Sequence, residues 1–316
     1  MPDKAWTGEL DTSDPTGIAP RGNEPYTQPE YWEWRFQREQ QNDWLVSGAA
    51  AVEVITPLLP PASTHPRVLL VGTGNSSLPA QLYEAGWTNL VATDIAASAI
   101  DAMQARYGDS HPGIAWECAD MLALVAQYGR HAFDAVVDKA AMDALLAHGG
   151  DTWHPPQELL DLGWTAALQS WAVLKPGAVY VQLSFGLPHL RAQYLQPPAA
   201  WAAEQLGVPA SALPAVEMAQ LEVPAAPEAS LASSTEAPVP APQSTASAAP
   251  DDTPAGAAGL FDAGVDTDDE FEPDAPVQSA ATPPQPVLWL MQHADLPVGF
   301  GYSIYSAHRA ACGYDE

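Results

Sequence analysis

Short apolar runs alternate with helical patterns along much of this chain. Runs rich in branched apolar residues predict strands near 68–72, 89–94, 114–118, 133–138 and 178–185, and the segments between them have the spacing of amphipathic helices. The run Leu174-Lys175-Pro176-Gly177 is predicted to end a helix and lead into the fifth strand, because Gly accepts the helix-ending conformation and Pro stops its continuation. Such alternation is typical of a parallel sheet covered by helices on both faces. The sequence therefore predicts a doubly wound α/β fold.

The strand pattern resumes near the C-terminus after a long segment of different composition. Runs that begin at Val287 and Phe300 predict an antiparallel hairpin that completes a seven-stranded, Rossmann-like sheet. Residues 208–286 are dominated by Ala, Pro, Ser, Thr, Asp and Glu and contain no Lys or Arg. A segment of this composition buries too little apolar surface to offset the entropy of ordering. We predict a disordered acidic insertion within one domain, which acts either as a solvated loop or as an arm that docks partners.

The first residues are polar and rich in turn formers. They predict a flexible tail that ends where a helix begins near Tyr31. Trp32 and Phe36 are four residues apart and share one face of that helix, a pattern that suits either core packing or a cover over a cleft. The predicted organisation is a tail at 1–28, the first part of the domain at 29–207, the insertion at 208–286, the closing hairpin at 287–310 and a second tail at 311–316.

The first predicted strand breaks into glycines in a way that is typical of nucleotide-binding folds. Gly72 and Gly74 have no Cβ, so the backbone can turn sharply and approach a ligand closely. Asp94 follows roughly 20 residues later at a strand end, where a carboxylate can accept hydrogen bonds from ribose hydroxyls. The structural alternative is an ordinary glycine turn in an α/β core.

Other features of the loop narrow the choice of nucleotide. Ser77 stands where a dinucleotide motif has its third glycine, which disfavours NAD. No Lys-Ser or Lys-Thr pair follows the loop, which excludes a triphosphate-binding P-loop. S-adenosylmethionine fits better, since it has a ribose and an amino-acid tail but no phosphate.

Two further strand ends carry polar residues toward the same cleft, because ligands of open α/β sheets bind at the carboxyl ends of the strands. Asp120 and Met121 follow the third strand and are candidates for contact with an adenine ring, although Asp120 also suits a helix cap. The fourth strand ends in Asp138 and Lys139; the lysine is either a cofactor ligand or the ion-pair partner of a nearby carboxylate.

The charge of the chain restricts its partners. Its 316 residues have a formal net charge of −28 with only eleven Lys and Arg, which argues against nucleic acid and favours a basic or lysine-presenting protein. The two cysteines, Cys118 and Cys312, have no metal-binding or disulfide pattern and are expected to be reduced. No metal site, signal peptide or membrane-spanning run is predicted, so we expect a cytoplasmic protein with no membrane contact; the sequence does not indicate an oligomeric state.

Several motifs together resemble a known family, the eukaryotic lysine methyltransferases that act on translation elongation factor 1 alpha. This family includes the methyltransferase-like 13 proteins and the elongation factor 1 alpha lysine methyltransferase 4 group. The similar segments are Tyr31-Trp32-Glu33-x-Arg35-Phe36, Asp43-Trp44, Gly72-Thr73-Gly74-Asn75-Ser76, Asp94, Met103-Gln104-Ala105-Arg106, Asp138 to Leu146, and Trp289-x-x-x-His293-Ala294 with Gly299-Phe300 and Ile304-Tyr305.

The resemblance implies a class I methyltransferase that uses S-adenosylmethionine. The implied cofactor contacts are Trp32, Phe36, Gly72, Asp94 with Ile95, Asp120 with Met121, and Lys139. One departure lies near the expected substrate entrance, where the family's Lys-Gly-Thr-Leu-Asp is Lys139-Ala140-Ala141-Met142-Asp143 here. In a second departure, Asn42 replaces the tyrosine that precedes Asp-Trp in the family.

Methyl transfer to lysine needs a neutral amine in line with the sulfonium. Asp138 and Asp143 are the acids expected near that amine, although Asp143 suits the start of a helix equally well. His189 and Arg191 are expected either to line the substrate side or to lie on the surface. Two alternatives to a protein-lysine methyltransferase remain: a non-catalytic scaffold that binds an adenosyl ligand, and a small-molecule methyltransferase or aminopropyltransferase.

The predicted insertion leads to a deletion test. Removal of residues 208–286, replaced by a short Gly/Ser linker, is expected to leave the unfolding temperature and the affinity for S-adenosylmethionine nearly unchanged, because shortening a disordered loop changes the closure entropy little. Thermal unfolding and calorimetric titration measure both quantities. Loss of cooperative unfolding in the deleted chain would show that the segment is structural.

Overall fold

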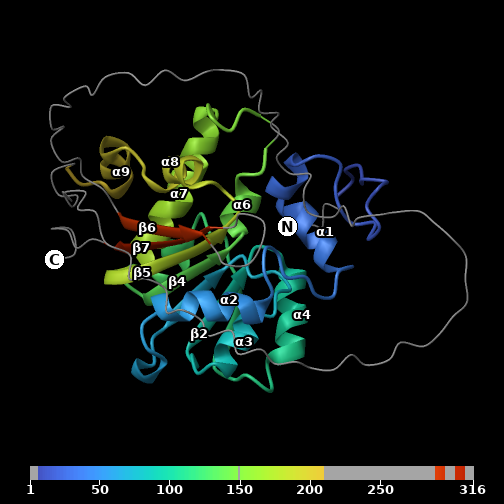
Figure 1. The fold of residues 1–316 in the computed structure, drawn as a ribbon, viewed down its shortest axis with the longest axis horizontal. Helices are drawn as coiled ribbons and strands as arrows, with labels where there is room; N and C mark the ends of the chain where they lie inside the picture. Colours follow the sequence, from blue (N-terminus) through green and yellow to red (C-terminus); the bar gives the residue numbers. More distant parts are fainter. Residues whose placement is uncertain (1–5, 149, 210–288, 296–302, 310–316) are drawn as a thin grey trace, which may run out of the picture. The chain divides into compact units, whose positions relative to one another are not determined.

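The computed structural model describes residues 6–148, 150–209, 289–295 and 303–309, and contains a seven-stranded sheet with the order β3-β2-β1-β4-β5-β7-β6 (Figure 1). Strands β1 to β5 are parallel, while β7 runs antiparallel to both β5 and β6. This arrangement confirms the predicted doubly wound fold and its C-terminal antiparallel pair. The strands are β1 Val68–Val71, β2 Leu90–Asp94, β3 Ile114–Cys118, β4 Phe133–Lys139, β5 Leu174–Ser184, β6 Trp289–Asp295 and β7 Ser303–Arg309.

Helices cover both faces of the sheet because successive strand residues point to opposite sides. Val68 and Leu70 of β1 pack in one apolar cluster, and Leu69 and Val71 pack in the other. The first cluster includes α2 Gly48–Ile55, α3 Leu78–Glu84 and α4 Ala97–Tyr107, which lie in the lower half of Figure 1. The second includes α5 Leu124–Tyr128, α6 Ala141–Leu145, α7 Gln157–Val173, α8 Pro188–Leu195 and α9 Ala199–Leu206.

The fifth strand begins earlier than its sequence suggests. Helix α7 ends at Val173, and Leu174 already pairs with Phe133, whereas the predicted strand began at 178. Leu174 is buried, and the ladder shifts register before Val179 pairs with Ala135. Gly177, with φ of +76°, lies within this irregularity. The Pro-Gly pair therefore produces a bulge inside the strand instead of preceding it.

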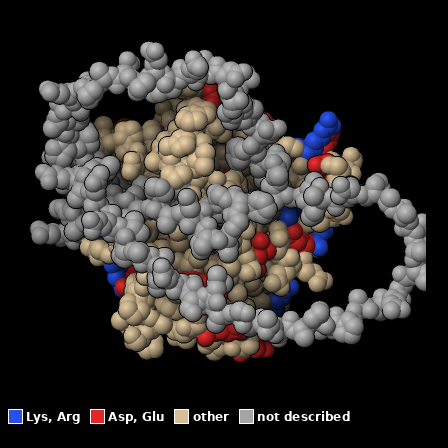
Figure 2. Space-filling model, in the orientation of Figure 1, with Lys and Arg blue, Asp and Glu red and all other residues tan. Residues whose placement is uncertain are grey.

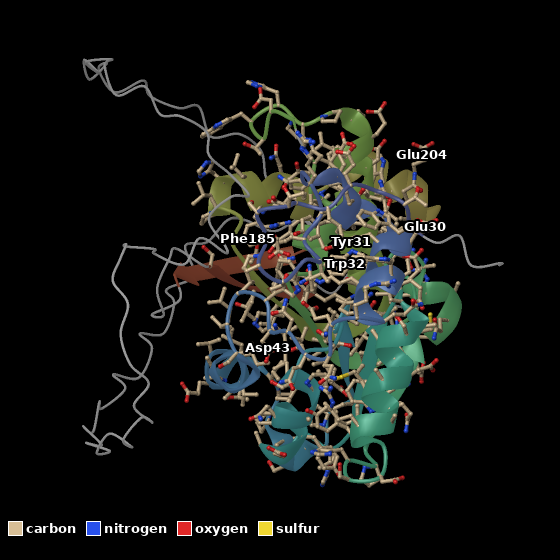
Figure 3. All side chains as sticks on the ribbon, turned by 90° about the vertical axis from the view of Figure 1, so that its right-hand side faces the viewer. Glu30, Tyr31, Trp32, Asp43, Phe185 and Glu204 are labelled. Carbon is tan, nitrogen blue, oxygen red and sulfur yellow. The ribbon has the colours of Figure 1, made fainter. Side chains whose placement is uncertain are left out.

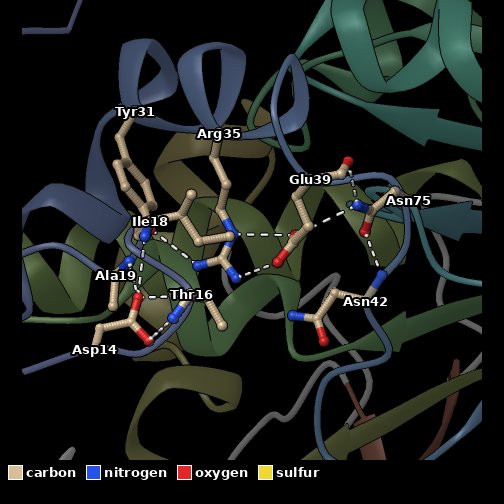
Figure 4. A network of polar contacts seen from close by, with 9 residues as sticks. All are labelled: Asp14, Thr16, Ile18, Ala19, Tyr31, Arg35, Glu39, Asn42 and Asn75. Atoms are coloured by element: carbon tan, nitrogen blue, oxygen red, sulfur yellow. Dashed lines mark hydrogen bonds and ion pairs between the residues drawn. The ribbon is translucent and has the colours of Figure 1, made fainter.

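The segment before the sheet differs from the flexible tail that we predicted. Residues 6–28 include the 3-10 helix η1 Glu24–Thr27 and lead into α1 Pro29–Phe36. The Asp14 carboxylate accepts backbone N–H groups from Thr16, Ile18 and Ala19, and the Tyr31 hydroxyl donates to the carbonyl of Ile18 at 3.0 Å (Figure 4). These tertiary contacts to α1 are invisible in a polar, turn-rich sequence, and they explain why this part of the prediction is wrong.

Two short 3-10 helices, η2 Thr56–Leu58 and η3 Ala62–Thr64, connect α2 to β1. Most of the predicted insertion, the turn of the hairpin and the C-terminal tail lie outside the described residues. Among the described helices, none has the length and apolar character needed to span a membrane.

Candidate functional site

The loop after β1 brings two glycines into a conformation that other residues rarely adopt. Gly72 has φ of +56° and Gly74 has φ of +51°. A Cβ at Gly72 would overlap the Cβ of Ala141, and a Cβ at Gly74 would lie 2.8 Å from Cζ of Phe36. Both positions therefore require glycine for conformation and for space. The loop therefore has no side chains at the two positions where α1 and α6 approach it.

Asp94 ties the end of β2 to this loop. One carboxylate oxygen accepts the Gly74 N–H at 2.7 Å and the other accepts the Ala96 N–H at 2.9 Å. Burial raises the pKa of Asp94 to about 6, against the opposing effect of these hydrogen bonds. The structure thus places Asp94 beside the glycines, as predicted, while Ile95 next to it is 40% exposed.

The aromatic pair of α1 covers the same loop. The rings of Trp32 and Phe36 stack with centroids 5.5 Å apart, and Phe36 packs with Ala96 and Ala99. Helix α1 is fastened to α4 because the Ser98 backbone N–H donates to a Glu33 carboxylate oxygen at 3.1 Å. Phe36 is therefore buried in a small apolar cluster, and its ring also lies against Gly74.

A polar network links α1 to the glycine loop (Figure 4). The buried Arg35 donates to Glu39 at 2.6 Å and to the Tyr31 hydroxyl at 2.9 Å. The Glu39 carbonyl accepts from the Asn75 amide at 3.0 Å, and the Asn75 side-chain oxygen accepts the Asn42 N–H at 3.1 Å. We did not predict this network; its sequence signal is the four-residue spacing of Arg35 and Glu39.

Lys139 faces the glycine loop and lies near the carboxylate of Asp43, which was not among the predicted site residues. Its Nζ donates to the Trp44 carbonyl at 2.9 Å and lies 3.6 Å from an Asp43 oxygen. The same Asp43 accepts hydrogen bonds from the hydroxyls of Ser76 and Ser77. Burial lowers the pKa of Lys139, and Asp43 opposes this shift. Lys139 also lines a small hollow together with Gly72, Thr73, Ser76 and Pro79.

Asp138 lies in the interior of the protein. It is fully buried and accepts the Tyr180 hydroxyl at 2.9 Å, the Gln182 amide at 2.8 Å and the Ala141 N–H at 2.8 Å. Burial raises the pKa of Asp138. The carboxylate therefore caps the first turn of α6 and ties it to β5, and the structure does not bring it to the surface of the cleft as the catalytic prediction required.

Asp143 is also buried, and its partner is a residue that we expected near the surface. Its Oδ1 accepts from the Arg191 guanidinium and from the Ser184 hydroxyl at 2.6 Å, and its other oxygen accepts the Phe185 N–H at 3.4 Å. Arg191 is only 5% exposed, so its predicted surface position is wrong. This ion pair joins α6 to α8 across the end of β5.

The turn between β4 and α6 contains one of the departures from the family pattern. Ala140 has φ of +67° at the position where that pattern has glycine. An alanine in this left-handed region costs about 1 kcal/mol more than a glycine. The conformation is therefore retained here without the residue that adopts it most readily.

Asp120 and Met121 lie in the loop after β3. The exposed Asp120 carboxylate accepts the Leu122 N–H at 2.8 Å, while Met121 packs partly buried against the cluster on the α7 side. The neighbouring Ala119 N–H donates to the Asp94 carbonyl at 3.0 Å. The β3 loop is thus joined to the end of β2. Asp120 makes a local turn contact and does not cap α5, whose N-cap residue is Ala123.

The Asp143–Arg191 pair makes a testable contribution to stability. Arg191→Met should lower the free energy of unfolding by about 3 kcal/mol or more, because it leaves a buried carboxylate without its countercharge. The double variant with Asp143→Leu should cost less than the sum of the two single changes. Urea unfolding measures all three values. A cost for Arg191→Met within about 0.5 kcal/mol of zero would contradict this assignment.

Comparison with known proteins gives related sequences but no matching family model. The chain is 29% identical over 178 residues to EEF1A lysine methyltransferase 4 of Mus musculus, covering 55% of this chain and 68% of that protein. It is 30% identical over 131 residues to the eEF1A lysine and N-terminal methyltransferase of Xenopus laevis, covering 41% of this chain and 18% of that protein.

Solved structures are more distant. A structure that describes the conversion of a disulfide bond into a thioacetal group during echinomycin biosynthesis aligns with a TM-score of 0.37 at 20% identity, over 51% of this chain and 61% of that chain. The glycopeptide N-methyltransferase MtfA, with bound S-adenosylhomocysteine, aligns with a TM-score of 0.33 at 17% identity, over 45% and 54%. The sequence relatives show that the chain is similar to the eEF1A lysine methyltransferases, which supports a methyltransferase that uses S-adenosylmethionine.

Proposed function

We propose that this chain transfers the methyl group of S-adenosylmethionine to a lysine side chain of a protein, and that elongation factor 1A is the first substrate to test. The observation that supports this proposal most strongly is the 29% identity with EEF1A lysine methyltransferase 4 over 178 residues. As part of the same proposal, the protein acts in the cytoplasm, where this substrate functions in translation.

The residues around the glycine loop suit the cofactor. The positive φ angles of Gly72 and Gly74 let the loop turn sharply after β1, and the buried Asp94 carboxylate beside it can accept hydrogen bonds from ribose hydroxyls. In this proposal Trp32 and Phe36 cover the bound cofactor, and Ile95 contacts it next to Asp94.

The remaining predicted ligands are assigned by charge and position. Lys139, which lines the hollow beside the loop, would pair with the carboxylate of the methionine tail. Asp120 and Met121 would contact the adenine, after the Asp120 side chain leaves its turn contact with Leu122.

The two buried acids act through position in this mechanism. Asp138 and Asp143 hold α6 against β5 and α8, and Ala141 at the start of α6 touches Gly72. The cofactor supplies an activated methyl group, and this chain orients the acceptor amine in line with it. Exclusion of water from around the bound lysine would lower its pKa, which favours the neutral amine that attacks.

The proposal is tested by methyl transfer. Incubation of the full chain with labelled S-adenosylmethionine and purified elongation factor 1A should label lysine, and replacement of the labelled lysine by arginine in the factor should abolish the signal. Cofactor binding without label in any protein of a lysate would favour the non-catalytic alternative. Preferential labelling of polyamines or small amines would favour the small-molecule alternative.

Asp94 gives the proposal a pH signature. Because its pKa is about 6 in the cofactor-free protein, affinity for S-adenosylmethionine should fall as the pH decreases through 6, where the carboxyl becomes protonated. Asp94→Asn should bind more weakly, by about tenfold, and should lose this pH dependence. Calorimetric titration between pH 5 and about 8 measures both effects.

Unfolding provides an independent control with the opposite sign. The raised pKa means that the folded state binds more protons than the unfolded state between 3.8 and about 6, so the contribution of Asp94 to stability decreases as the pH rises through this range. If the affinity for S-adenosylmethionine also decreases as the pH rises through this range, Asp94 acts only on folding.

A further inference from the structure

An exposed tryptophan lies outside the residues assigned to the cofactor and to the methyl transfer. Trp153, in the loop between α6 and α7, is 63% exposed, although large aromatic side chains are usually buried. One face of its ring stacks on His189 of α8, with centroids 4.9 Å apart and planes 25° from parallel. The indole is therefore held in place while much of its surface stays open to solvent.

The loop that carries Trp153 is anchored on α8. The Gln193 amide donates to the Thr152 carbonyl at 3.3 Å, and the Asp151 carboxylate accepts the Trp153 N–H at 2.8 Å. Leu187, just before α8, is 50% exposed and adds apolar surface at the same helix end. Together, Asp151, Trp153, Leu187 and His189 form what we call the α8 surface.

A chain of contacts connects the α8 surface with the cofactor loop. Ala141 at the start of α6 touches Gly72, and Asp143 of α6 pairs with Arg191 of α8. Arg191 is two residues from His189, on which Trp153 stacks. The N-terminal element η1 also lies beside α6. Figure 3 labels Tyr31 and Trp32 on α1 and Phe185 directly after the end of β5.

The chemistry of the α8 surface suits a cationic side chain. The face of an indole attracts Lys and Arg cations, and it does so more strongly than a Phe or Tyr ring. The Asp151 carboxylate is 56% exposed, and its hydrogen bonds to His154 and Trp153 lower its pKa, so it is negatively charged at neutral pH. An aromatic face with a fixed carboxylate two residues away is a combination that selects basic side chains.

The charge of the whole chain favours the same occupant. Its net charge is −28, and acidic side chains are visible over α3 and beside the α1 segment in Figure 2. The chain's own segment at 208–286 has no Lys or Arg and many carboxylates, so it lacks the cation that this surface would select. A separate basic protein meets the requirement better.

We propose that the α8 surface docks the methyl-accepting protein by binding a second Lys or Arg side chain, apart from the lysine that is methylated, between Trp153 and Asp151. This inference rests on the proposed function for the identity of the partner, and on the exposed, stacked indole for the site. The target lysine enters the cleft at the glycine loop, while the second cation fixes the orientation of the substrate protein.

Matched variants of Trp153 test the inference. Trp153→Leu keeps an apolar side chain but removes the aromatic face, and it should raise the KM for the protein substrate about fivefold with unchanged kcat and unchanged affinity for S-adenosylmethionine. Trp153→Phe keeps an aromatic ring and should raise the KM less than Trp153→Leu does. Asp151→Asn should raise the KM in the same direction. Equal KM values for the Leu variant and the unchanged chain would overturn the inference.

A binding measurement separates this inference from the proposed function. Fluorescence anisotropy of a labelled octalysine peptide, at about 0.15 M salt to screen distant charges, should show weaker binding to the Leu variant than to the Phe variant. If the chain methylates no protein but this difference persists, the docking surface stands and the proposed function fails. If methylation proceeds and both variants bind octalysine equally, the function stands and the docking surface fails.

Self-association is the remaining alternative for an exposed aromatic surface. Sedimentation of the full chain and of the Leu variant measures it directly. A change from dimer to monomer caused by Trp153→Leu would assign the α8 surface to contact between two copies of this chain, and would overturn the docking of a basic substrate.

Discussion

The close approach of three separate segments to the backbone of Gly72 and Gly74 is the constraint on which the site depends. Phe36 from α1 and Ala141 from α6 occupy the space that a Cβ at these glycines would need, and Asp94 from β2 holds the loop by a hydrogen bond to Gly74. Any side chain at either glycine would displace a helix as well as strain the turn. The loop conformation, the aromatic cover and the start of α6 are therefore set together.

Buried charge stabilises the opposite side of the cleft. Asp138 and Asp143 are buried at the junction of β4, β5, α6 and α8, where each carboxylate has several hydrogen-bond donors. Charges in such positions are tolerated only when they are paired or hydrogen-bonded, so their partners are tightly defined. In the proposed mechanism they position α6, which carries Ala141 against the loop. The two acids that the sequence offered as catalytic candidates are buried in the structure and hydrogen-bonded to neighbouring elements.

The N-terminal segment was only partly predictable from local sequence patterns. The aromatic spacing of Trp32 and Phe36 indicated a covering helix, and the structure places Phe36 over Gly74. The Arg35–Glu39 contact near this helix is local. The hydrogen bonds from Asn75 to Glu39 and from Ser76 to Asp43 instead join residues more than thirty positions apart in the chain. Hydrogen bonds between residues so far apart in the sequence leave no periodic signal. The motifs therefore included Asn75 and Asp43 without indicating their partners.

The sequence by itself determined the order of strands and helices, the glycine turn, the acid at the end of β2 and the resemblance to a methyltransferase family, because periodicity, glycine and short motifs are local properties. Only the tertiary structure decided which polar residues are buried and with whom. It moved Asp138 and Asp143 inside, paired Lys139 with Asp43, buried Arg191 and left Trp153 exposed on His189. Burial and pairing depend on which elements pack together, and that information is distributed over the whole chain.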